Sequence, residues 1–439
     1  MTAYPFTYKT LDDLRAASDK LGLQIPISED LSVLGENTSL GSSGITLDNR
    51  LIVHPMEGFD TTEDGAPDTL TMRRYERFAK SGASMGWCEA ISVCEEGRSN
   101  KHQMWIHKGN LDAYKRMVDM FHETSGGKPI IAQMTHSGRF SAPEGTLHPL
   151  VLYKNPLFDK TKFHDIDDIP LVTDDYLDSL IEKYHEATAL AVEAGFDGID
   201  IKACHKYLLG ETLAAYEREG KYGGSFENRT RLFRTIIKNT ADAFGDKVFL
   251  ASRFNLYDAM VYPYGFGCSR EDFMVPDVDE IGALVTEMEN LGISCINITM
   301  GTPYLTPHIN RPHTLGGVIP EDPLIGADRM IRYTGELQRR FPNIALVGAG
   351  YSFFREFAPY VAAGAIRAGL TTLVGFGRMA FAYPDFASAM ISGTFDRMKT
   401  CLTCSKCTEL MRTHHSTGCP VRDRELYLEP YRKYCQGKN

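Results

Sequence analysis

Short apolar runs alternate with longer amphipathic segments along most of the chain. Eight runs predict β-strands, at residues 50–56, 82–92, 129–134, 198–202, 248–253, 294–299, 344–349 and 371–376. Their apolar positions are continuous, which is typical of strands that are covered on both faces. The segments between them predict helices at residues 70–81, 110–124, 174–194, 226–244, 278–291, 325–341 and 353–364.

The clearest helix prediction covers residues 174–194. Its apolar side chains recur at steps of three and four residues, so they form one stripe that can be buried. Gly195 follows the segment as a stop signal. Strands that alternate with helices in this way predict an α/β fold with a parallel sheet.

The strand count favours a closed TIM (β/α)8 barrel over an open, doubly wound sheet. An open sheet is expected to carry a glycine-rich dinucleotide turn after its first strand. Here the first strand runs into HPMEGFD, which has a single glycine. We therefore expect an N-terminal extension at residues 1–48, the barrel at 49–394 and a cysteine-rich C-terminal tail at 395–439.

Composition narrows the class of protein. Hydrophobic residues make up 43% and charged residues 24% of the 439, which is ordinary for a globular protein. A net charge of −10 argues against nucleic acid or an anionic membrane as a partner. The first residues lack a secretory apolar region, and no apolar run reaches the length of a membrane span. We expect a cytoplasmic homo-oligomer whose ten cysteines are reduced thiols or metal ligands.

In a barrel of this kind, chemistry sits where the strands end. The third strand ends in Gln133, whose amide can both donate and accept hydrogen bonds to a planar heterocycle. The fifth ends in Arg253, which offers a cation. The seventh and eighth end in glycine turns, GAG and GFGR, where backbone N–H groups and Arg378 can bind a phosphate. Together these ends predict a phosphorylated heterocyclic cofactor.

The fourth strand ends in an unusual group of polar residues, within GFDGIDIKACHKYLL at 195–209. Lys202, His205 and Tyr207 lie close together there, with Cys204 and Lys206 between them. A buried strand rarely ends this way, so we interpret the stretch as part of an active site.

Six stretches in order resemble the Old Yellow Enzyme family of FMN-dependent oxidoreductases, over roughly residues 45–390. They are HPMEG, QMTHSGR, FDGIDIKACHKYLL, KYGGSFENRTRL, ASRFNLYD and LVGFGRMAFAYPDF. The resemblance implies a TIM barrel with FMN at the strand ends. The cofactor contacts that it and the strand ends predict are Pro55, Met56, Glu57, Ala90, Gln133, Arg253, Gly348, Gly350, Gly377 and Arg378.

The resemblance also gives the fourth strand a role. In this family a pair of donors grips a substrate carbonyl oxygen and a tyrosine delivers a proton, which here implies Lys202, His205 and Tyr207. The first donor is usually histidine, the residue before the tyrosine is usually glycine where Lys206 stands, and Glu57 replaces a threonine or cysteine. Cys204 is expected to point away from the ligand.

The tail carries Cys401, Cys404, Cys407 and Cys419 in a C-x2-C-x2-C-x11-C pattern. Four thiolates are what a [4Fe–4S] cluster requires, and the same four-cysteine set also binds zinc, to which His414 and His415 could contribute. Similar tails occur in the iron–sulfur branch of the family, with trimethylamine dehydrogenase and 2,4-dienoyl-CoA reductase. Those relatives continue into a further dinucleotide-binding portion, which this sequence does not include. The remaining cysteines, Cys88, Cys94, Cys268, Cys295 and Cys435, are expected to be packing residues.

The sequence thus predicts an FMN-dependent enzyme that reduces the activated C=C bond of an α,β-unsaturated carbonyl. NADH, NADPH or a ferredoxin-like electron-transfer protein would supply the electrons. Two alternatives stay open: an amine dehydrogenase that passes electrons to the cluster, and a flavin-binding electron carrier without catalysis.

Overall fold

The computed structural model describes residues 4–158, 169–315 and 319–436. Eight parallel strands close into a barrel in the described chain, because the last strand pairs with the first, Val374 opposite Leu51. The predicted TIM barrel is therefore confirmed. Its strands are β3 (Leu51–Val53), β4 (Met85–Ser92), β5 (Ile130–Thr135), β6 (Gly198–Ile201), β7 (Phe249–Asn255), β8 (Ile293–Thr299), β9 (Ala345–Gly348) and β10 (Leu373–Phe376).

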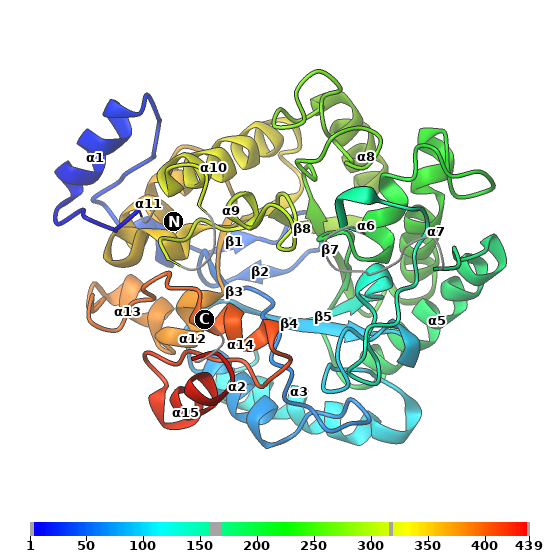
Figure 1. Cartoon of the computed structure of the whole chain (residues 1–439). Helices are drawn as coiled ribbons and strands as arrows, with labels where there is room; N and C mark the ends of the chain where they lie inside the picture. The colour runs from blue at the N-terminus through cyan, green and yellow to red at the C-terminus, as the bar shows by residue number, and fades with distance from the viewer. Residues whose placement is uncertain (1–3, 159–168, 316–318, 437–439) are drawn as a thin grey trace.

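Helices surround this barrel (Figure 1). They include α2 (Thr69–Ala79), α3 (Leu111–Ser125), α5 (Asp174–Glu193), α7 (Phe226–Phe244), α8 (Val278–Asn290), α10 (Pro323–Arg340) and α11 (Ala358–Arg367). In α5 the Thr173 side chain accepts a bond from Tyr176 N, and Gly195 follows with φ +94° as the predicted stop. The predicted helix at 353–364 differs. A 3-10 segment, η5 (Tyr351–Phe357), comes first, and Arg355 with φ +50° separates it from α11.

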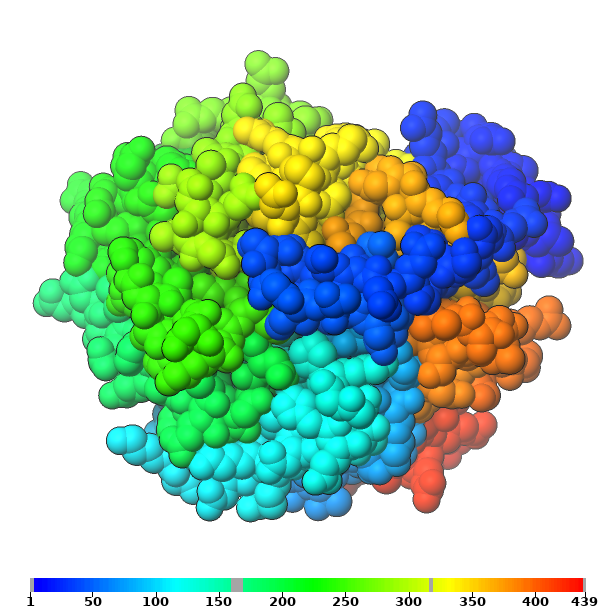
Figure 2. All heavy atoms as spheres, turned by 180° about the vertical axis from the view of Figure 1, so that it is seen from behind, coloured from blue at the N-terminus to red at the C-terminus, as the bar shows by residue number. Residues whose placement is uncertain are grey.

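The N-terminal segment closes one end of the barrel. After α1 (Leu11–Lys20), the hairpin β1 (Thr38–Ser39) and β2 (Thr46–Leu47) places Leu40 and Leu47 against Trp87 and Phe249 of the barrel interior. At Gly41 (φ +53°) a Cβ would lie 2.0 Å from a carbonyl oxygen of β8, so only glycine fits this approach. Figure 2 shows this segment crossing the rear face. The opposite end, where the strands finish, is left for ligands.

The tail lies over that opposite end, in the front of Figure 1. It contains α14 (Lys406–Arg412) and α15 (Arg424–Tyr434), and it follows α12 (Arg378–Ala382) and α13 (Phe386–Ser392) of the barrel. Thr417 N donates to Gly58 O at 2.7 Å, and Arg73 of α2 pairs with Asp423 at 2.8 Å. The tail is thus joined to the loop that follows β3. In the part of the chain that the structure describes, no helix has the length and apolarity needed to cross a membrane.

Candidate functional site

A cavity of about 310 Å³, called here the central cavity, opens among the carboxyl ends of the strands. The predicted residues on its wall are Pro55, Met56, Glu57, Ala90, Gln133, Lys202, His205, Tyr207, Arg253, Gly350, Gly377 and Arg378. Gly348 lies outside the wall, where its N–H donates to Thr371 Oγ1 at 3.0 Å. Cys204 is buried and also lies outside it, as expected.

Lys202 and Glu57 face each other across one side of the central cavity. Lys202 Nζ is 3.8 Å from Glu57 Oε1 and 4.1 Å from the centre of the Tyr207 ring. Burial lowers the pKa of Lys202 and raises the pKa of Glu57. Among the described residues, Glu57 Oε2 is buried without a hydrogen-bond partner. The side chain of Glu57, and not only its backbone, is therefore part of the site.

His205 stands in a strained turn. Its φ is +61° and that of Lys206 is +58°, a conformation that residues with a side chain rarely adopt. His205 Nε2 lies 3.5 Å from Thr299 Oγ1 at the end of β8. Burial, and then the nearby charges of Arg253 and Lys202, lower the pKa of His205 well below its usual value. His205 is therefore a neutral imidazole that can donate one hydrogen bond.

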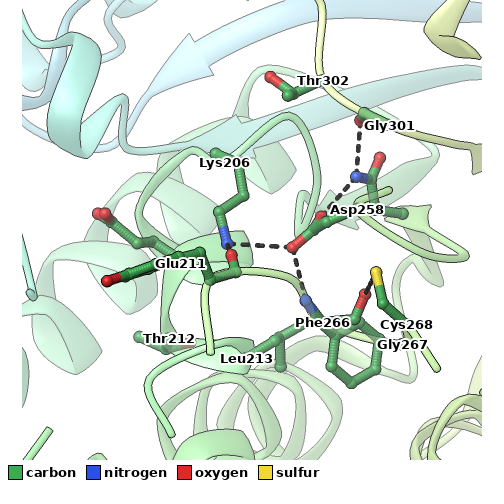
Figure 3. A network of polar contacts seen from close by, with 12 residues as sticks. Lys206, Glu211, Thr212, Leu213, Asp258, Phe266, Gly267, Cys268, Gly301 and Thr302 are labelled. Carbon is green, nitrogen blue, oxygen red and sulfur yellow. Dashed lines mark hydrogen bonds and ion pairs between the residues drawn. The ribbon is translucent and has the colours of Figure 1, made fainter. Parts of the chain in front are cut away.

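Lys206 holds this turn in place through a pair with Asp258 (Figure 3), and it is not among the residues that line the central cavity. Its ammonium donates to Asp258 Oδ2 at 3.0 Å, to Tyr153 Oη at 3.1 Å and to Tyr264 O at 2.9 Å. The other oxygen of Asp258 accepts a bond from Asn255 Nδ2 at 2.7 Å. Asn255 Nδ2 also donates to the carbonyl of the loop after β8, at 2.8 Å. One buried ion pair thus joins the ends of β6, β7 and β8.

Tyr207 follows the turn and reaches the central cavity. Its hydroxyl oxygen is 3.2 Å from that of Tyr304, a residue of the loop after β8. The Tyr304 ring stacks on Phe140, with ring centroids 3.7 Å apart. Burial raises the pKa of Tyr207 well above its usual value, so the phenol is protonated at neutral pH. Tyr304 was not predicted, because no local pattern marks its loop.

The side of the central cavity near Gln133 suits a planar heterocycle. Gln133 Nε2 donates to Asp200 Oδ2 at 2.6 Å, which fixes the amide and leaves its oxygen for another partner. Arg253 Nη1 donates to Pro55 O at 3.2 Å, and Arg253 Nε is buried without a partner in the described chain. His54, which was not predicted, lies 2.9 Å from Asn297 Nδ2.

The glycine turns at the ends of β9 and β10 form a cation-rich corner. Arg378 Nη2 donates to Pro312 O at 2.9 Å, while its Nη1 is buried without a partner in the region described. A Cβ at Gly350 would lie 2.9 Å from a methionine sulfur, and one at Gly377 would lie 2.5 Å from another. Arg311, which sequence patterns did not single out, is close enough that burial and Arg378 lower its pKa to about 9. Two crowded guanidinium groups favour a bound anion.

These features fit FMN. Buried donors without partners stand at the heterocycle side, on Arg253, and at the cation-rich corner, on Arg378. A phosphate would satisfy the corner and a polar ring would satisfy Arg253 and the Gln133 oxygen. The residues present therefore match both ends of the cofactor that the sequence predicts.

The four tail cysteines surround a second, much smaller cavity of about 20 Å³, called here the cysteine pocket. Cys407 and Arg378 line both cavities, so the two sites adjoin. Among the described residues, no three of these cysteines have sulfur atoms within 4.8 Å of one another. A tetrahedral zinc with Zn–S bonds of about 2.3 Å needs sulfurs roughly 3.8 Å apart. The sulfurs are therefore not arranged as a tetrahedral zinc site requires.

Another set of potential ligands, Cys94, Glu96 and His136, lies within that distance. His136 Nδ1 accepts the Gly138 N–H at 3.0 Å, so Nε2 carries the proton and bonds Tyr176 Oη at 2.8 Å. No ring nitrogen then remains for a metal, and we interpret the group as structural. Cys94 is buried, as predicted, together with Cys88, Cys268 and Cys295, whereas Cys435 is only partly buried.

Residues 39–267, just over half of the chain, match the NADH:flavin oxidoreductase / NADH oxidase family. The chain belongs to this family, and the resemblance predicted from its motifs is confirmed. An NADH oxidase of Thermoanaerobacter brockii is 24% identical over 373 residues, which cover 82% of this chain and 51% of that protein. An NADPH dehydrogenase of Halalkalibacterium halodurans is 29% identical over 211 residues, 47% of this chain and 60% of that protein. The chain thus spans between half and two thirds of the length of these relatives.

Solved structures show the same fold. An Old Yellow Enzyme homologue from Zymomonas mobilis has a TM-score of 0.64 and 20% identity, over 91% of this chain and 99% of that one. A 2-naphthoyl-CoA reductase has a TM-score of 0.71 and 20% identity, over 91% of this chain and 58% of that one. A histamine dehydrogenase from Rhizobium sp. 4-9 has a TM-score of 0.70 and 20% identity, over 90% of this chain and 53% of that one. These neighbours include both reductases and amine-oxidising enzymes, so the likeness alone does not select the reaction.

Proposed function

We propose that this protein is an FMN-dependent oxidoreductase that reduces the activated C=C bond of an α,β-unsaturated carbonyl compound. The observation that carries the proposal is the grouping of Lys202, His205 and Tyr207 on a wall that also holds Gln133 and Arg253. FMN supplies the hydride when it is bound. The three residues after β6 then supply what the substrate needs besides a hydride.

Lys202 and His205 bind the carbonyl oxygen and stabilise the negative charge that builds on it. A preorganised donor of this kind contributes roughly 3 kcal/mol, which is a hundredfold or more in rate. Neutral His205 donates one bond, and Lys202 adds a charge that is buried beside it. Tyr207, protonated at neutral pH, gives its phenolic proton to the α-carbon as a general acid.

The electron donor is proposed to be NADH or NADPH, which the names of the matched relatives mention. We further propose a [4Fe–4S] cluster on Cys401, Cys404, Cys407 and Cys419. The observation in its favour is the position of all four around one pocket, without the compact group of sulfurs that a zinc ion requires. An electron-transfer protein that feeds the cluster, and assembly into a homo-oligomer, stay predictions.

Oxidation of an amine is the competing reaction. With a phosphate at the corner of Arg311 and Arg378, the wall of the central cavity still carries the cations Lys202, Arg253 and Arg412 against the carboxylate of Glu57. This excess of positive charge repels an alkylammonium ion and attracts an oxygen that carries negative charge. The charge of the wall therefore favours the reductase.

Stopped-flow measurement of both half-reactions tests the proposal. The reduced protein is mixed anaerobically with cyclohexenone, and the oxidised protein with an alkylamine, while flavin absorbance is followed. We expect the enone to reoxidise the flavin and the amine to leave it oxidised. Flavin reduction by the amine, with no reaction of the enone, would replace the reductase by an amine dehydrogenase. No reaction with either would leave the electron-carrier alternative.

A further inference from the structure

A second tyrosine shares the part of the central cavity where Tyr207 lies. Tyr304 lines the cavity, and its hydroxyl oxygen is 3.2 Å from that of Tyr207. Both side chains belong to one apolar cluster with Phe140 and Met260. Because Tyr207 follows β6 and Tyr304 follows β8, only the closed barrel brings the two hydroxyls together.

Either hydroxyl of this pair can donate to the other, because a phenol both donates and accepts a hydrogen bond. As Tyr207 gives its proton to the substrate, its oxygen becomes an acceptor. Tyr304 then lies in place to donate, since its hydroxyl oxygen is 3.2 Å away.

Proton donation by Tyr207 creates a need that this arrangement meets. If Tyr207 gave its proton away alone, it would become a phenolate in a buried position, 5% exposed. Burial raises the pKa of Tyr207 and so disfavours this phenolate, which a proton from the nearest donor, moving at the same time, would avoid. Tyr304 is that neighbour, and it is less buried than Tyr207, so water in the mouth of the cavity can reach it.

We propose that Tyr304 is a further catalytic residue, which relays a proton from water in the cavity mouth to Tyr207. The proposal rests on the proposed function. The β-carbon of the substrate gains a hydride from the reduced cofactor, and the α-carbon gains the Tyr207 proton. The Tyr304 proton moves to the Tyr207 oxygen, and water reprotonates Tyr304. The C=C bond is reduced, the cofactor is oxidised by two electrons, and both tyrosines end unchanged.

A double-mutant cycle on the FMN-loaded enzyme tests this relay. The variants are Tyr304→Phe, Tyr207→Phe and the two combined, and the measurement is reoxidation of the reduced enzyme by an enone. We expect Tyr304→Phe to slow the reaction roughly tenfold, less than the hundredfold or more for loss of the acid itself. In the Tyr207→Phe background the same change should have no further effect, because the relay has lost its acceptor. Tyr264→Phe is the matched control, since that ring packs in the same cluster but lies outside the cavity wall.

A proton inventory in mixed H₂O and D₂O separates the relay from a packing effect. Two protons moving together give a curved dependence in the unaltered enzyme, and Tyr304→Phe should make it linear. In protein labelled with [¹³Cζ]tyrosine, Tyr304→Phe should also shift the Tyr207 resonance without any turnover. Additive rate effects, a linear inventory in the unaltered enzyme or an unshifted resonance would each overturn the relay. If the enzyme reduces enones but gives one of these contrary results, the relay is wrong and the proposed function stands. If the enzyme reduces no enone, both the relay and the proposed function are wrong.

Discussion

The ion pair beneath the active-site turn offers a sharp test of how the site is held. Lys206→Met removes the ammonium from a side chain with no exposed surface. Asp258 Oδ2 keeps its bond from Phe266 N at 2.9 Å, but Tyr264 O and Tyr153 Oη lose their donor. Breaking one partner of a buried pair costs about 3–5 kcal/mol. We therefore expect Lys206→Met to be strongly destabilising.

The expected change in melting temperature follows from the size of the chain. Unfolding entropy is about 2.1 cal/mol/K per residue, so for a chain of 439 residues a loss of 3–5 kcal/mol lowers Tm by roughly 3–5 °C. Lys206→Gly should be at least as destabilising as the methionine variant, because the packing lost at a fully buried side chain outweighs the relief of strain at φ +58°. Thermal unfolding of the FMN-loaded variants measures both differences.

The same variants show whether the pair positions the catalytic turn. Loss of the ion pair should displace His205 and Tyr207, and this displacement should slow reoxidation of the flavin by an enone. Retention of FMN should stay unchanged, because Lys206 does not line the central cavity. Asp258→Asn, which keeps the shape but removes the charge, should give the same pattern more weakly. A Lys206→Met protein with unaltered Tm and reoxidation rate would refute the idea that this pair holds the turn.

Four further outcomes are expected. Arg253→Ala should release FMN on gel filtration without lowering the helical content, and denatured protein should yield free FMN rather than FAD or a covalent flavin. Anaerobically purified protein should contain about four iron and four sulfide ions per chain. The Cys404→Ser variant should contain neither, and one zinc ion per chain without sulfide in the unaltered protein would contradict the cluster. Lys202→Met should slow reoxidation by an enone tenfold to a thousandfold and leave reduction by NAD(P)H nearly unchanged. Burial lowers the pKa of His136 to about 4, whereas the unfolded chain gains this proton near pH 6.5, so stability falls as pH drops from 6.5 to 4. In urea unfolding, the stability deficit of His136→Asn should therefore shrink by about 2 kcal/mol from pH 7 to pH 4.5.

The regular elements of this protein are encoded locally. Every predicted barrel strand is present within a few residues, because a strand covered on both faces must be apolar along its whole length. The prediction failed at 353–364, where apolar residues run on through η5 into α11 without a change of period. Pro359 marked where the α-helix begins, because proline favours the first turn of a helix and lies in the first turn of α11.

The strand ends that face the ligand could also be found from sequence, since each follows a recognisable strand. Gln133, Lys202 and Arg253 all line the central cavity. What sequence could not supply were partners from distant loops. Tyr304 reaches Tyr207 across 97 positions of the chain, and His54 reaches Asn297 across 243.

Sequence alone therefore determined the barrel, the polar strand ends in chain order, and the spacing of the four cysteines, because these depend on residues close together in the chain. The tertiary structure decided which of those groups meet. It turned Lys206 away from the cavity into a pair with Asp258, directed the Glu57 carboxylate toward Lys202, and placed Cys407 between two cavities. Closure of the barrel is the physical reason, since it brings the ends of all eight strands to one rim whatever their distance in sequence.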